Sequence, residues 1–207
     1  MMPANRSPRI AVFDIGGVLI EWDPRHLYRK LFPGDEAAME RFLAGVCTPE
    51  WNLEQDRGRS WDEAVAVLTE RFPDLAELIA AYHLRWEEMV PGPVEGTADL
   101  LRTLKSRGRP VYAITNFSAA KLALARRRFD FLNLFDGVVV SGEERLVKPD
   151  PAIYRRLLDR YALDAAETLF IDDVERNVEA ARGVGMQAIR FTGADALRRD
   201  LEQAGML

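Results

Sequence analysis

The feature that most constrains the fold is an alternation of short apolar runs and amphipathic helical stretches that begins after residues 91–93. Continuous apolar runs that alternate with helices are typical of a parallel sheet covered on both faces. With the N-terminal run at 10–13, the sequence therefore predicts an α/β fold with a Rossmann-like, five-stranded parallel sheet. The later runs lie at residues 110–115, 137–140, 168–171 and 187–190.

Residues 23–89 differ from the rest of the chain because they show helical periodicity and almost no strand pattern. Ser60, followed by Glu63, has the capping-box pattern at the start of one of these helices. We therefore expect an α/β core domain of residues 1–22 and 90–207. Residues 23–89 are expected to form a small α-helical cap domain inserted after the first strand.

The composition limits the classes of function. The 207 residues carry a formal net charge of −5, which argues against nucleic-acid binding. Cys47 is the only cysteine, so an intrachain disulfide and a cysteine-based zinc site are excluded. The chain has no apolar run of about 18 residues that could span a membrane, and residues 1–8 lack the apolar core of a signal peptide. We expect a cytoplasmic protein with no nucleic-acid or membrane partner.

Polar residues follow the expected strands at the points where the strands end. The carboxyl ends of parallel strands form one edge of a sheet, and folds of this class bind ligands there. We therefore expect these polar side chains to converge on one crevice. They are Asp14, Thr115 with Asn116, Ser141, and Asp172 with Asp173.

The acidic pair Asp172-Asp173 has two interpretations. Two carboxylates about 4 Å apart repel each other by about 4 kcal/mol at an effective dielectric constant of 20. A cation among them and Asp14 would relieve this repulsion, and hard oxygen ligands suit Mg²⁺. Alternatively, the acids cap the helix that is expected to begin at Val174.

Three further residues supply groups that an anion would need. Lys148 precedes a proline and should stand out from an extended segment, where it could neutralise a bound anion. Thr115 and Asn116 offer hydroxyl and amide donors to phosphate oxygens. Neither a G-x-G-x-x-G nor a G-x-x-x-x-G-K-[ST] motif is present. A response-regulator receiver is an alternative, since it also uses acids, a Thr or Ser and a Lys-Pro on a parallel sheet. It would carry the acidic pair on the first strand and the Lys-Pro last, which is the reverse of the order found here.

The order Asp, Thr-Asn, Lys-Pro and Asp-Asp resembles the haloacid dehalogenase-like (HAD) hydrolase superfamily over essentially the whole chain. The helical insertion matches the small cap of that family, which closes over the site and selects the substrate. The chain looks like a member of subfamily IA, with similarity to sugar-phosphate phosphatases and, over residues 147–186, to the N-terminal phosphatase domain of soluble epoxide hydrolases. The motifs are Phe13-Asp14-Ile-Gly16-Gly17-Val18-Leu19, Ile114-Thr115-Asn116, Val147-Lys148-Pro149 and Phe170-Ile-Asp172-Asp173-Val-Glu-Arg-Asn177.

The resemblance implies a hydrolase of phosphomonoesters (EC 3.1.3.-) that acts on a small phosphorylated metabolite. Asp14 would attack phosphorus and form an aspartyl phosphate that water then hydrolyses. Lys148 and Thr115 would assist the chemistry. The substrate would contact Thr115, Asn116, Lys148, Gly16 and Gly17.

The resemblance also implies a Mg²⁺ cofactor. The ligands would be the carboxylates of Asp14 and Asp173 and the backbone carbonyl of Gly16, with Asp172 or Asn177 assisting. The ion would let an anionic nucleophile approach an anionic phosphate.

One position departs from the pattern of the family's phosphatases. They commonly carry a second aspartate two residues after the nucleophile as general acid and base, and Gly16 stands there in this chain. Loss of a positioned acid/base typically lowers the rate by about 10² to 10⁴-fold. A phosphatase therefore has two rivals, a metal-free 2-haloacid dehalogenase-type hydrolase and a weakly active phosphate-binding or regulatory protein. Asp23 and His26 could replace the missing acid, although Asp23 is also placed to cap a helix.

Overall fold

Short aliphatic runs form one parallel sheet in the computed structural model, which describes residues 7–207. Residues 1–6, on which the signal-peptide expectation partly rests, lie outside the described residues. The strands follow the order β3-β2-β1-β4-β5, and each neighbouring pair is parallel. The predicted α/β sheet is therefore confirmed. The strands are β1 (Ile10–Phe13), β2 (Val111–Thr115), β3 (Gly137–Val140), β4 (Thr168–Asp172) and β5 (Gln187–Arg190).

Helices cover both faces of this sheet because successive strand residues point to opposite sides. In β1, Ala11 and Phe13 belong to one apolar cluster, whereas Val12 belongs to another. The first cluster includes side chains of α6 (Thr97–Ser106), α7 (Ala119–Arg128) and α11 (Ala194–Gln203). The second includes side chains of α9 (Pro151–Tyr161) and α10 (Glu175–Gly183). Short turns complete this part: η3 (Asp130–Asn133), α8 (Ser141–Glu144) and η4 (Ala165–Glu167).

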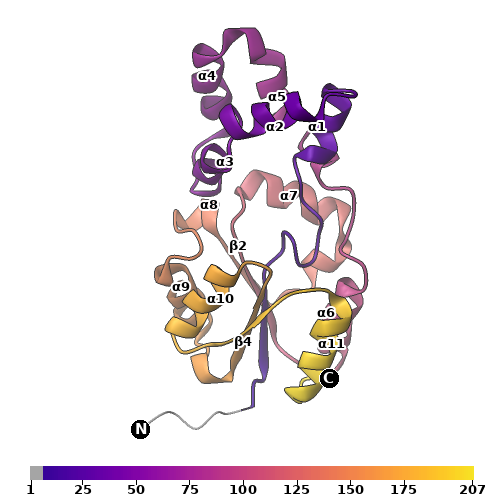
Figure 1. Ribbon diagram of the computed structural model, residues 1–207. Coiled ribbons are helices and arrows are strands. Elements are labelled where there is room, and N and C mark those ends of the chain that lie inside the picture. The colour runs from indigo at the N-terminus through magenta and orange to yellow at the C-terminus, as the bar shows by residue number, and fades with distance from the viewer. Residues whose placement is uncertain (1–6) are drawn as a thin grey trace.

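Residues 25–89, here called the helical segment, contain helices and 3₁₀ turns and no strand. Figure 1 shows this segment beyond the carboxyl ends of the strands, with α3 nearest to α8. Side-chain caps fix several helix starts, and Ser60 accepts a hydrogen bond from the Glu63 amide as expected. The elements are α1 (Arg25–Leu31), α2 (Glu36–Gly45), α3 (Pro49–Asp56), α4 (Trp61–Arg71), η1 (Pro73–Leu75), α5 (Ala76–Leu84) and η2 (Trp86–Met89).

The two chain crossings that join the helical segment to the sheet run side by side. The Glu21 amide donates to the Gly92 carbonyl and the Asp23 amide to the Met89 carbonyl, both at 3.0 Å. None of the helices in residues 7–207 is long and apolar enough to cross a membrane.

Contacts away from these two crossings hold the helical segment against α7 and α8. Trp61 Nε1 donates to Ser118 Oγ at 3.0 Å, and Lys121 Nζ donates to the His83 carbonyl at 2.6 Å. Gly58, which has a φ of +102°, lies so close to α8 that a Cβ there would come 2.8 Å from a backbone oxygen. The end of α3 therefore rests directly on the backbone of α8.

Candidate active site

Asp14 lies at the carboxyl end of the central strand. Its amide donates to the Ile171 carbonyl at 2.8 Å, which continues the pairing of β1 with β4. Its Oδ1 accepts from the Ile15 amide at 2.7 Å, and its Oδ2 lies 2.7 Å from Lys148 Nζ. The carboxylate is thus held in one orientation, while the residue keeps 7% of its surface exposed.

Lys148 is fixed through both its backbone and its side chain. The Lys148 amide donates to Asn116 Oδ1 at 2.8 Å, and Asn116 Nδ2 donates back to the Lys148 carbonyl at 3.1 Å. Lys148 Nζ lies 2.7 Å from both Asp14 Oδ2 and Asp172 Oδ2. Burial alone would lower the pKa of Lys148, but the charges of the two aspartates outweigh it and raise this pKa. Lys148 is therefore a firmly charged group beside Asp14.

Asp172 bonds to an amide just before α10 and to Lys148. Its Oδ1 accepts from the Val174 amide at 2.8 Å, next to the start of α10, and its Oδ2 pairs with Lys148. Asn177 Nδ2 donates to both oxygens, at 3.0 and 3.1 Å. Asp172 is completely buried and positions Lys148 from behind, outside the lining of the cavity described below.

Asp173 faces the cavity, and Gly17 leaves room for it. Gly17 has a φ of +77°, and a Cβ at this position would lie 2.6 Å from Asp173 Oδ2. A side chain at residue 17 would therefore displace the Asp173 carboxylate. At Gly16, by contrast, a Cβ would meet nothing within 4 Å.

The acidic cluster has the donor set of a Mg²⁺ site. Ligand oxygens of Asp14, Asp172 and Asp173 all lie within 4.8 Å of one another. Burial raises the pKa of Asp14 to about 7 against the opposing effect of Lys148, and burial also raises the pKa of Asp173. The three carboxylates share one lysine, Lys148, so a bound cation would favour their ionised forms, and hard carboxylate oxygens fit Mg²⁺.

Thr115 lies at the end of β2, next to β1, and is 1% exposed. Its Oγ1 has no hydrogen-bond partner within the described residues, although buried hydroxyls usually have one. Thr115 does not line the cavity, whereas the adjacent Asn116 does. Of the two polar residues after β2, Asn116 thus both faces the cavity and fixes Lys148.

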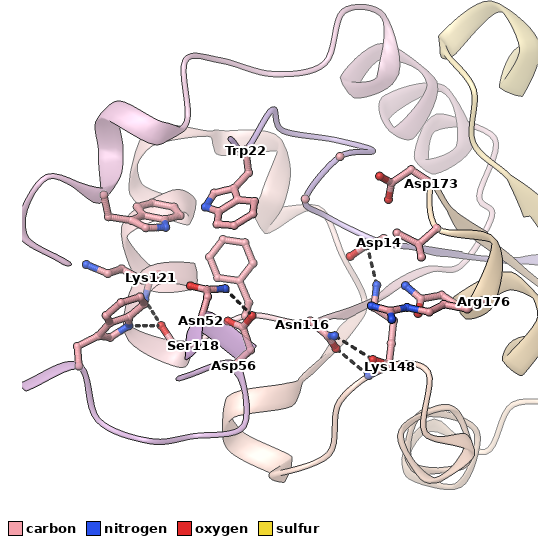
Figure 2. Close-up of a pocket in the computed structure, with 17 residues that line it drawn as sticks. Asp14, Trp22, Asn52, Asp56, Asn116, Ser118, Lys121, Lys148, Asp173 and Arg176 are labelled. Atoms are coloured by element: carbon pink, nitrogen blue, oxygen red, sulfur yellow. Dashed lines mark hydrogen bonds and ion pairs between the residues drawn. The ribbon is translucent and has the colours of Figure 1, made fainter. Parts of the chain in front are cut away.

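A cavity of about 300 Å³ lies between the strand ends and the helical segment. Figure 2 shows Asp14, Lys148 and Asp173 at one end, with Trp22 and Lys121 toward the other. Lys121 is buried, its pKa is lowered to about 8 by burial, and its Nζ lies near two tryptophan rings. The aromatic lining residues are Trp22, Trp61, Trp86 and Phe117.

Several lining residues were missed by the sequence reasoning. Arg176, on the exposed side of α10, could have been found because it lies within the fourth motif. Asp56, the last residue of α3, carried no comparable sequence pattern. Neither Asp23 nor His26 is among the described residues that line this cavity. Asp23 instead accepts from the Arg25 amide at 2.9 Å; the N-cap of α1 is Pro24, so Asp23 lies one residue before the cap position expected of it.

Comparison with known proteins decides the family. Residues 8–185 match the family model described as haloacid dehalogenase-like hydrolase. The chain belongs to this family. The fold and the order of the four motifs agree with this membership, and the resemblance inferred from the sequence is confirmed.

Three relatives illustrate the membership. A sesquiterpene phosphatase, astK, from Aspergillus oryzae is 32% identical over 196 residues, which cover 94% of this chain and 95% of that protein. Bifunctional epoxide hydrolase 2 from Sus scrofa is 27% identical and matches 94% of this chain, which spans only 38% of that longer protein. A HAD family enzyme from Bacteroides thetaiotaomicron, solved with magnesium and inorganic phosphate, is 25% identical. It has a TM-score of 0.69, over 90% of this chain and 95% of that chain.

Proposed function

We propose that this HAD-like hydrolase is a Mg²⁺-dependent phosphatase that acts on a small phosphorylated metabolite through an aspartyl-phosphate intermediate on Asp14. The observation that carries the proposal is the position of Asp14, which faces the cavity within the acidic cluster and is 2.7 Å from Lys148. A nucleophilic carboxylate, a fixed cation and oxygen ligands are the groups that phosphoryl transfer requires. The phosphatase name of one relative and the magnesium and phosphate bound in another support it.

Asp14, the Gly16 carbonyl and Asp173 would hold Mg²⁺, with Asp172 behind them fixing Lys148 and α10. When bound, Mg²⁺ supplies positive charge that lets two anions approach each other. The fit rests on the close carboxylate oxygens and on the space that Gly17 leaves for Asp173.

The chain's own residues orient the attack. The Ile15 amide and Lys148 hold one oxygen each of the Asp14 carboxylate, so its position is set before the substrate arrives. Lys148, Asn116 and Arg176 offer donors toward the phosphoryl oxygens. The Thr115 hydroxyl lacks a partner among the described residues and lies at the same strand ends, although Thr115 does not line the cavity.

Residues 23–89 would act as the cap domain over a core of residues 1–22 and 90–207. The aromatic end of the cavity would receive the organic part of the substrate, and Trp22, one of its lining residues, is 36% exposed. Such a lining favours an apolar organic part, since flat aromatic faces gain most from covering hydrocarbon. The sesquiterpene phosphatase among the relatives is in line with this preference.

The test is hydrolysis of p-nitrophenyl phosphate and of phosphate esters with apolar and sugar-like organic parts. We expect activity that requires Mg²⁺ and falls by at least about 10³-fold in Asp14→Asn. Asp99→Asn, an exposed carboxylate on α6 paired with Arg102, serves as the matched control and should keep full activity. Equal turnover in excess chelator would contradict the metal dependence.

Two other results would replace the proposal. Metal-independent release of chloride from 2-chloropropionate, without phosphatase activity, would indicate a dehalogenase. Calorimetric binding of phosphate and Mg²⁺ without turnover of any ester would indicate a binding or regulatory protein.

A further inference from the structure

We propose that Asp56, supplied by the helical segment, is the general acid and base of the reaction, in the place of the carboxylate that Gly16 lacks. This inference rests on the proposed phosphatase function. It concerns a residue that none of the four sequence motifs contains.

Asp56 faces the same cavity as the nucleophile although it comes from a different part of the chain. It ends α3, is half-buried, and accepts a hydrogen bond from Asn52 Nδ2 at 3.1 Å. It forms no ion pair with any residue in the described range 7–207. In Figure 2 Asp56 and Asn52 lie between the Lys121 end of the cavity and the group formed by Asp14, Asn116 and Lys148.

The location suits the geometry of phosphoryl transfer. The attacking and leaving oxygens lie roughly in line on opposite sides of phosphorus. Asp14 attacks from the strand ends, so the leaving oxygen points away from the sheet, toward the helical segment. Asp56 is a carboxyl on that side, whereas Asp23 and His26 lie outside the cavity lining.

The surroundings of Asp56 bring its pKa close to neutral pH, as a general acid and base requires. Burial raises its pKa from 3.8 to about 7, and Lys148 lowers the pKa only in part. A carboxyl with a pKa near neutrality can both donate and accept a proton at physiological pH. Lys148 and, from α5, Tyr82 interact electrostatically with Asp56. The other titratable or charged groups that line the same cavity are Lys121, Arg176, Asp14 and Asp173.

Asp56 would act once in each half of the reaction. In the first, Asp14 bonds to phosphorus, the bond from phosphorus to the ester oxygen breaks, and protonated Asp56 gives its proton to that oxygen. In the second, Asp56 takes a proton from water as the water oxygen bonds to phosphorus. The bond from phosphorus to Asp14 then breaks, which regenerates the carboxylate and releases phosphate.

The test compares Asp56→Asn with wild type on esters whose leaving groups differ in their need for a proton. p-Nitrophenolate leaves as a stable anion, whereas an alkoxide must be protonated. With an alkyl phosphate, kcat should fall by about 10² to 10⁴-fold without a burst. With p-nitrophenyl phosphate, a burst of one equivalent of p-nitrophenol should precede slow turnover, because the phosphoenzyme forms but lacks its base. With the alkyl phosphate, the pH–rate profile should lose its decline above about pH 7, which reports the ionisation of the general acid Asp56.

The matched control is Glu54→Gln, the same chemical change on α3 at a surface carboxylate paired with Arg57. It should retain wild-type kinetics with both esters. Unchanged kinetics in Asp56→Asn, or an equal loss with both esters and no burst, would overturn the assignment. Absence of turnover in wild type would instead count against the proposed function, so the two failures are distinguishable.

Discussion

The substitution Lys148→Met removes the cation that joins two buried carboxylates. Lys148 Nζ is 2.7 Å from both Asp14 and Asp172, and the side chains of Lys148 and Asp172 are 1% and 0% exposed. Methionine fills a similar volume without a charge, so the change isolates the loss of the ion pairs from any loss of packing.

The expected cost follows from what remains around Asp172. Removing one partner of a buried ion pair typically costs about 3–5 kcal/mol. Asp172 still accepts hydrogen bonds from the Val174 amide and from Asn177, so the lower end of that range applies. A loss of about 3 kcal/mol should lower Tm by about 6–12 °C in a domain of this size.

The assay is urea and thermal unfolding of the metal-free protein at pH 8. Lys105→Met is the control, because Lys105 Nζ also lies 2.7 Å from a carboxylate, Asp136, but this ion pair is exposed. This variant should lose less than about 1 kcal/mol of unfolding free energy. The double variant Lys148→Met/Asp172→Asn should recover most of the lost unfolding free energy, because it also removes the unpaired buried charge of Asp172. Equal losses in both lysine variants, or no recovery in the double variant, would refute the reasoning.

Three further predictions concern the glycines and Asp56. Gly17→Ala should weaken Mg²⁺ binding, measured by calorimetry, and activity, because the new Cβ meets the Asp173 carboxylate. The control is Gly34→Ala, which also has a positive φ but lies in open space. It should lower only the stability measured by unfolding. The raised pKa of Asp56 means that the folded state holds this proton more tightly than the unfolded state. The free energy of unfolding should therefore fall as the pH rises from about 4 to about 7. The Tm of Asp56→Asn should therefore match wild type at pH 4 and exceed it above pH 7; a constant difference would contradict the shift. Gly16→Asp, which the open space accommodates, should restore part of the alkyl phosphatase activity lost in Asp56→Asn, whereas a further loss would show that residue 16 cannot serve this role.

The sheet and its carboxyl edge could be predicted because local patterns determine them. The apolar runs and helix starts are encoded within a few residues, such as Ser60 at α4 and Asp150 at α9. Once the strands are known to be parallel, the residues after them must meet at one edge. The meeting of Asp14 with Asp172 and Asp173 follows from this rule, whereas Lys148 lies on the loop after α8 and its place beside Asp14 was expected from the family resemblance.

The rest of the candidate site could not be predicted, because it depends on contacts between segments that are distant in the sequence. Asp56 is one acid among several on surface helices, and only the packing of α3 over the strand ends brings it to the cavity. The sequence predicted Asn116 as a donor to phosphate. Its hydrogen bonds to the Lys148 backbone could not be predicted, because they join residues 32 positions apart. No local pattern distinguishes such residues from ordinary polar ones.

The contact between Gly58 and α8 restricts how this protein can evolve. A Cβ at Gly58 would lie 2.8 Å from the Gly142 oxygen, and one at Gly142 would lie 3.0 Å from the Phe117 oxygen. A side chain at Gly58 must therefore shift the end of α3 away from α8, and Asp56, two residues earlier, would move with it, whereas a side chain at Gly142 would press on the segment before α7. Substitutions on the outer surface of the helical segment would leave this contact intact, while a substitution at Gly58 alone would change the position of an acid that this glycine does not touch.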